Sequence, residues 1–150
     1  MNNYPKDIID GVEVPPLVIR EDYDLLGKHN GAIYIEHGEL RLMGHHNGSL
    51  HAQPNTKIEI LGEQNGSTHI EHGATVSVKG SANGSMHLER GGELIICEGG
   101  KHSGSLHNSG KVVIRGTHGG SIHDDGDIIV EAGGRLIKPT IKNGVSYYEW

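Results

Sequence analysis

The chain repeats a pattern of alternating aliphatic and polar residues about every 18 positions. In the clearest stretch of each repeat, two Leu, Ile or Val residues flank one variable residue. These pairs are Leu40/Leu42, Ile58/Ile60, Val76/Val78, Leu94/Ile96, Val112/Ile114 and Ile128/Val130. A period of two with β-branched residues predicts a β-strand with one buried face.

A second alternating stretch follows an Asn-Gly-like dipeptide in each repeat. Its inward candidates are Ile33/Ile35, Leu50/Ala52, Thr68/Ile70, Met86/Leu88, Leu106 and Ile122. The same alternation points one ring outward in every repeat, and these rings are Tyr34, His51, His69, His87, His107 and His123. We predict this column as the binding face. Two other interpretations of the column are left open. In one, the rings stack only as a structural ladder on the sheet, and in the other they bind metal.

The repeat unit is marked by Gly-x-x-Asn-Gly-Ser-x-His, with the best copies starting at Gly44, Gly62 and Gly80. The six leading glycines are separated by 17, 18, 18, 20 and 16 residues. The last two spacings average 18, which predicts a small insertion around Gly91 and Gly92. Six copies in register predict a solenoid in which equivalent residues become neighbours.

Strands this short bury their apolar faces only when coils stack at ~4.8 Å. The sequence therefore predicts an all-β, single-domain parallel β-helix (β-solenoid) of six coils over residues 27–133. In it, an amide ladder forms from Asn30, Asn47, Asn65 and Asn83. Residues 1–26 and 134–150 carry prolines and, at the end, aromatics, so we expect them to be end caps. An antiparallel meander would suit Asn-Gly turns but would not explain the repeated side chains.

A second histidine set lies two residues after the leading glycine, at His29, His46, His102 and His118, with Gln64 and Ala82 in the middle repeats. The sequence leaves open which side this set faces. Zinc needs three or four converging ligands, whereas a straight column offers two neighbours per ion. No metal and no cofactor is predicted. Stacked imidazolium ions repel, so we expect depressed histidine pKa values and lower stability below about pH 6.5.

Composition narrows the possible partners. The formal net charge of −6 leaves no basic stripe for nucleic acid but suits a basic protein partner. Cys97 is the single cysteine, so no intrachain disulfide forms. Residues 1–10 lack the features of a signal peptide, and no apolar run is long enough to span a membrane. A cytoplasmic location without membrane contact is the expectation.

Catalytic signals are weak. Ser-x-His recurs in five repeats without an acid placed to orient the histidine, which indicates repeat geometry rather than a hydrolase. Trimeric hexapeptide-repeat acyltransferases also use 18-residue coils, with an aliphatic residue at every sixth position. This chain has two aliphatic pairs per coil and a glycine-rich third side instead. We therefore expect a protein that is not an enzyme and keep the acyltransferase as an alternative.

The repeat also resembles a known family. The stretch Val76-Ser-Val-Lys-Gly-Ser-Ala-Asn-Gly-Ser-Met-His-Leu88 is similar to the repeat of bactofilins and related polymer-forming proteins. The resemblance covers residues 27–133 and implies a right-handed β-helix and self-assembly. The aliphatic position of that repeat is filled here by the second histidine set. We predict a non-catalytic module that docks or neutralises a protein partner, as a toxin-immunity protein does, with a bactofilin-like polymer as the alternative.

Overall fold

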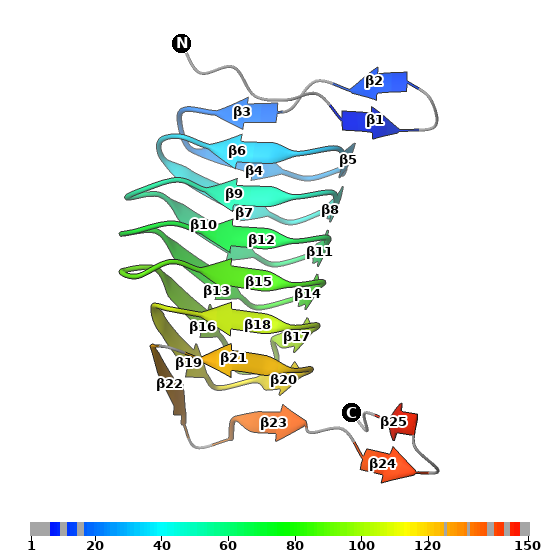
Figure 1. The fold of residues 1–150 in the computed structure, drawn as a ribbon. Coiled ribbons are helices and arrows are strands. Elements are labelled where there is room, and N and C mark those ends of the chain that lie inside the picture. The colour runs from blue at the N-terminus through cyan, green and yellow to red at the C-terminus, as the bar shows by residue number, and fades with distance from the viewer. Residues whose placement is uncertain are drawn as a thin grey trace.

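A computed structural model of the chain describes residues 7–9, 12–14, 17–124, 126–131, 133–137, 140–142 and 145–147, with side chains described for 17–123, 126–131 and 133–136. Its short strands form three parallel sheets that stack as a β-solenoid of about six turns (Figure 1). The structure thus confirms the all-β parallel solenoid predicted from the repeat.

Each coil contributes one strand to each sheet. Sheet 1 consists of β3 (Leu17–Ile19), β6 (Ile33–Ile35), β9 (Leu50–Ala52), β12 (Thr68–Ile70), β15 (Met86–Leu88), β18 (Leu106–Asn108) and β21 (Ile122–Asp124). Sheet 2 consists of β4 (Tyr23–Leu25), β7 (Glu39–Leu42), β10 (Lys57–Ile60), β13 (Thr75–Val78), β16 (Glu93–Ile96), β19 (Lys111–Ile114) and β22 (Asp127–Val130). Sheet 3 consists of β5 (Lys28–Asn30), β8 (His45–Asn47), β11 (Glu63–Asn65), β14 (Ser81–Asn83), β17 (Lys101–Ser103), β20 (Thr117–Gly119) and β23 (Arg135–Ile137).

Two antiparallel hairpins lie outside these sheets. They are β1 (Asp7–Ile9) with β2 (Val12–Val14), and β24 (Thr140–Lys142) with β25 (Val145–Tyr147). The parallel sheets themselves extend into both segments that the sequence assigned to caps, since β3 pairs with β6 and β23 pairs with β20. The capping role of the ends stays a prediction. The described part has no helix long and apolar enough to cross a membrane.

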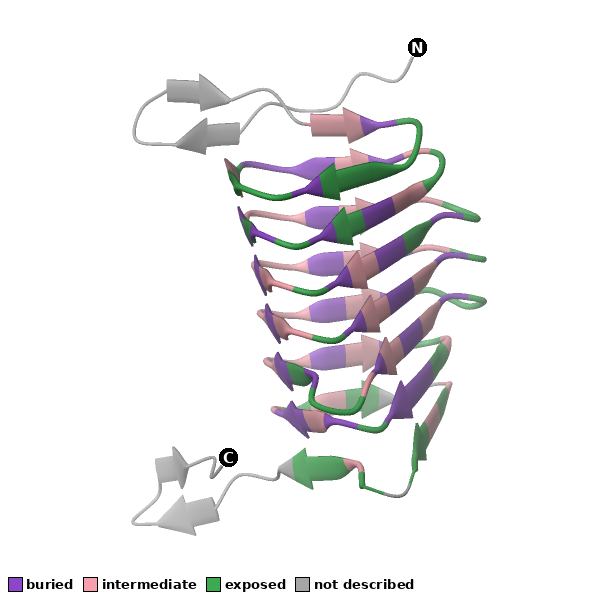
Figure 2. Cartoon of the chain, turned by 180° about the vertical axis from the view of Figure 1, so that it is seen from behind, coloured by how far each residue is buried: buried purple, intermediate pink, exposed green. Residues whose placement is uncertain are grey.

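The core is a thin stack of aliphatic layers. Figure 2 shows buried segments recurring at equivalent places in successive coils. Ile58 lies in register between Leu40 and Val76, and all three side chains are fully buried. The inward positions that the alternation predicted in sheets 1 and 2 are buried throughout the middle coils. Strands of three or four residues bury their inward aliphatic side chains only because the coil above and the coil below cover them.

Each coil has a third strand that the sequence pattern did not predict. Sheet 3 forms from the segment that was interpreted as a glycine-rich side, and each of its strands sends one residue inward. In the middle coils these residues are His46, Gln64 and Ala82. A strand with one inward residue shows no alternation of apolar and polar residues. Where that inward residue is itself polar, as at His46 and Gln64, the sequence gives no sign that the position is buried.

The insertion lies at a different corner from the predicted one. Val78 pairs with Ile96 and Ser81 with Lys101, so two extra residues separate Ile96 from Lys101. The corner at Gly91 and Gly92 has the same length as its counterpart in the coil before. The prediction was wrong because the spacing of leading glycines locates an insertion only within a whole coil.

Glycines allow the coils to stack tightly at two corners. At Gly66, φ is +127°, and a Cβ there would lie 2.3 Å from the carbonyl oxygen of Gly48. The leading glycines form a second column, in which a Cβ on Gly62 would lie 2.1 Å from the oxygen of Gly44. Both columns are filled by glycine because the backbone of the neighbouring coil occupies the space of a side chain.

This column supplies a matched test of coil stacking. Gly62→Ala should lower the free energy of unfolding by about 3 kcal/mol, the upper end of the usual cost of overpacking, because its Cβ collides with backbone rather than with a flexible side chain. Gly27→Ala, in the first coil of the same column, meets nothing within 4 Å and should change stability by less than about 1 kcal/mol. Urea unfolding of both variants measures the difference, and equal midpoints would contradict the stacking.

Candidate functional site: the histidine face

The six predicted rings form one continuous stack on the outer surface of sheet 1. The ring centroids of successive coils are 4.4, 4.7, 4.9, 4.7 and 4.8 Å apart from Tyr34 to His123. Neighbouring rings are tilted by 9° or less. Parallel register puts His69 directly between His51 and His87. The structure therefore brings together every residue of the predicted face.

Polar columns flank the rings on both sides. The Ser49 hydroxyl lies 3.1 Å from His51 Nε2, and the Ser85 hydroxyl lies 3.1 Å from His87 Nε2. On the other side, Glu36, Gln53, Glu71 and Glu89 follow the strands of successive coils. We call this surface, which combines the ring stack with its serine and glutamate columns, the histidine face.

Burial lowers the pKa of two central rings of the stack, His69 and His87. Partial burial lowers the pKa of His69, although the Glu89 carboxylate opposes this effect. Burial also lowers the pKa of His87, and the charges that His69 and His107 acquire on protonation lower it further. Burial and the nearby Glu89 raise the pKa of Glu71. The centre of the face thus favours neutral rings at His69 and His87, beside the glutamate column.

The stacked geometry does not suit metal chelation. Zinc–nitrogen bonds of about 2.0–2.1 Å keep two coordinating nitrogens within about 4.2 Å of each other, with their lone pairs converging. Parallel rings 4.7–4.9 Å apart point equivalent nitrogens in the same direction instead. Within the described residues, no group of three His, Cys, Asp or Glu side chains could hold a metal ion.

The second histidine set faces the core, which the sequence had left open. His46, His102 and His118 are 0–1% exposed on the inner side of sheet 3. His46 Nε2 donates to the Gly31 carbonyl over 2.6 Å, and His102 Nε2 donates to the Gly84 carbonyl over 2.8 Å. Burial lowers the pKa of all three rings. This set contributes to the interior of the solenoid and not to the histidine face.

The asparagines form the predicted amide ladder along the edge of sheet 3. The side-chain amide of Asn47 donates to Asn30 over 3.0 Å, that of Asn65 to Asn47 over 3.0 Å, and that of Asn83 to Asn65 over 2.9 Å. Asn47 and Asn65 each donate to the coil before and accept from the coil after, so the ladder fixes the vertical register of side chains.

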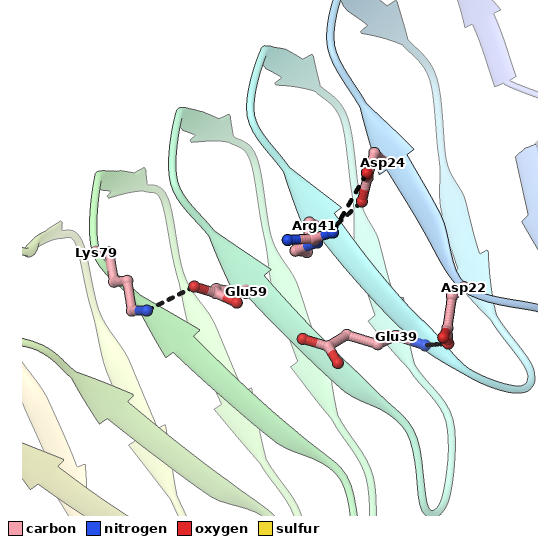
Figure 3. Close-up of polar contacts among 6 residues, drawn as sticks. All are labelled: Asp22, Asp24, Glu39, Arg41, Glu59 and Lys79. Atoms are coloured by element: carbon pink, nitrogen blue, oxygen red, sulfur yellow. Dashed lines mark hydrogen bonds and ion pairs between the residues drawn. The ribbon is translucent and has the colours of Figure 1, made fainter.

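A separate acidic depression of about 310 Å³ lies on sheet 2 near the first coils (Figure 3). Asp22, Asp24, Glu39, Arg41 and Glu59 line it. Arg41 pairs with Asp24, and Lys79 reaches Glu59 over 2.6 Å. This cluster was not among the predicted sites, although the register of the coils places Asp24, Arg41 and Glu59 in one outward column.

The stack yields a titration prediction. Replacing both His69 and His107 by glutamine should raise the pKa of His87, because two neighbouring positive charges no longer form. Burial remains, so the pKa should still lie below the ordinary value of 6.5. Proton NMR titration of the His87 ring measures both effects. A pKa unchanged by the double substitution would contradict electrostatic coupling along the stack.

Comparison with protein-family models, with curated proteins and with solved structures gives no match to this chain. The repeating parallel solenoid of roughly 18-residue coils is shown by the structure itself.

Proposed function

We propose that the chain is a non-catalytic binding module whose histidine face docks a basic protein. The observation that carries the proposal is the unbroken stack from Tyr34 to His123. Inter-coil hydrogen bonding, the aliphatic core and the glycine corners already account for the solenoid. An outward ring in every coil adds a flat and evenly spaced surface that the fold itself does not require.

Charge selects the partner. The chain carries a formal charge of −6, and Glu36, Glu71 and Glu89 run alongside the ring stack. A partner with lysine or arginine side chains complements this column, while the ring edges and serine hydroxyls supply hydrogen-bonding groups. Neutralisation of a basic toxin by an immunity protein is one role of this kind.

The test compares two faces of the same coils. His69→Ala/His87→Ala removes two central rings of the histidine face, and Ser77→Ala/Ile95→Ala removes matched outward side chains from sheet 2. Proteins captured from the native host by the wild-type chain are identified, purified and titrated calorimetrically against both variants. We expect a basic partner whose affinity falls at least about tenfold for the ring variant only and weakens with salt.

Two results would contradict docking through this face. One is an affinity that the ring variant leaves unchanged. The other is an equal loss for the sheet 2 variant, because that would place the partner elsewhere. Circular dichroism of both variants checks that each retains the β-rich fold.

End-to-end self-assembly, the bactofilin-like alternative, is supported by a separate observation. Among the described strands, the parallel sheets end in β3, β4 and β5 on one side and in β21, β22 and β23 on the other. Val130 and Leu136 occupy inward columns of the last coil yet are 44% and 36% exposed, whereas Ile114 in the coil before is fully buried. Edge strands with exposed core positions can pair with another copy.

Sedimentation velocity over a concentration series tests this alternative. Self-assembly predicts larger species as concentration rises, and Val130→Lys should suppress them by placing a charge at the exposed end. Ser77→Lys puts the same charge on a sheet face and serves as the control. A single monomeric species of wild-type protein at every concentration would exclude the polymer and leave the docking proposal standing.

A further inference from the structure

Two buried histidines contact each other inside the C-terminal coils. His102 on β17 and His118 on β20 are adjacent in the inward column of sheet 3 and are 0% and 1% exposed. Their Nδ1 atoms are 2.7 Å apart, and their ring centroids are 4.8 Å apart. An Nδ1–Nδ1 contact this short requires one hydrogen between the two rings.

Hydrogen-bond accounting fixes where that hydrogen lies. A carbonyl only accepts, so His102 uses its Nε2–H to donate to Gly84. Neutral His102 then has a bare Nδ1, which accepts the Nδ1–H of His118. His118 Nε2 is left without a hydrogen and makes no hydrogen bond of normal geometry within the described residues, although the nearby Gly120 backbone favours protonation of the ring. The pair can take up one proton at His118 Nε2 and keep this contact, but a second proton goes to His102 Nδ1 and removes the acceptor.

No described counter-charge faces the pair. Ala82 precedes His102 in the column and Leu136 follows His118. The inward residues that sheets 1 and 2 contribute to these coils are Leu106, Asn108, Ile122, Val112, Ile114, Ile128 and Val130. Asp124, whose side chain lies outside the described part, pairs in register with Asn108 of sheet 1. On the strands of the pair themselves, the charged residue is Lys101, which is exposed.

His46 occupies the same inward column in the N-terminal half, and both of its ring nitrogens face hydrogen-bond acceptors. His46 Nε2 faces the Gly31 carbonyl, and its Nδ1 lies 2.5 Å from Gln64 Oε1. Gln64 uses its amide N–H to donate to the Gly48 carbonyl. His46 therefore sits between two oxygen acceptors, and an added proton gives it a second donor instead of removing an acceptor. Protonation of both rings therefore breaks the His102–His118 contact, whereas protonation of His46 leaves both of its contacts in place.

We propose that the His102–His118 pair is an acid-sensitive latch that holds the C-terminal coils closed at neutral pH and releases them first when the pH falls. The inference does not depend on the docking function. Solenoid coils contact only their neighbours, so the end that contains the latch can open while the remaining coils stay stacked.

The direction follows from proton linkage. Burial is the main cause that lowers the pKa of His118 to about 4, the neighbouring His102 adds to it, and a backbone contact at Gly120 opposes it. Burial also lowers the pKa of His102. Opened coils regain histidine pKa values near 6.5, so they bind protons that the closed coils do not. Closure is fully stable above about pH 6.5 and weakens as the pH falls below it.

Hydrogen exchange measured by mass spectrometry tests the latch at about pH 7.5 and about pH 5, after correction for intrinsic exchange rates. A histidine that is neutral in the closed coils and protonated in the opened coils shifts the equilibrium towards opening as the pH falls. At about pH 5, each such histidine raises the equilibrium constant for opening by up to about thirtyfold. Peptides covering β17 to β20 should therefore lose up to about a thousandfold in protection. Peptides covering β10 to β14 should lose much less.

Substitutions taken from the same column identify the cause. His102→Gln/His118→Leu uses residues that the column already accepts at Gln64 and Leu136, and it should abolish the selective loss at β17 to β20. His107→Gln/His123→Gln removes the outward rings of the same coils and should preserve that loss. If the double core variant does not fold, His118→Leu alone should still reduce the loss. An undiminished loss in the core variants, or its disappearance in the outer variant, would overturn the latch.

Discussion

Vertical register between parallel coils is the constraint on which the molecule depends. Every sheet repeats one residue above its equivalent, so His69 lies between His51 and His87 just as Ile58 lies between Leu40 and Val76. Backbone hydrogen bonds set this register, and the asparagine ladder repeats it in the side chains. Whatever residue a coil carries at a given position becomes part of a column, which is why both the core and the histidine face extend over several coils.

The same register gives imidazole two different roles. On the outer face of sheet 1, the rings stack at 4.7–4.9 Å and remain partly exposed, so their edges are available to a partner. Inside sheet 3, His46, His102 and His118 replace aliphatic core and must satisfy their nitrogens with carbonyls, an amide or each other. Burying polar rings in this way costs free energy unless they are hydrogen-bonded, and it ties the stability of the core to protonation.

The repeat made sheets 1 and 2 and the ring column predictable, because alternation in strands such as 58–60 and 68–70 directly reports which side chains point inward. Sheet 3 was not predictable in the same way, since one inward residue per strand shows no period. The inward direction of His46 and His102 depended on that missing strand. The acidic depression at Asp24 and Glu59 depends on how far side chains reach between coils, which a sequence pattern does not specify.

Contacts between imidazole protons of adjacent coils report the register most directly. In a nuclear Overhauser spectrum at neutral pH, the account predicts cross-peaks from His69 to His51 and His87, and from His107 to His87 and His123, with none from His51 to His107. Absent contacts between adjacent rings, or a contact that skips a coil, would contradict the parallel stack.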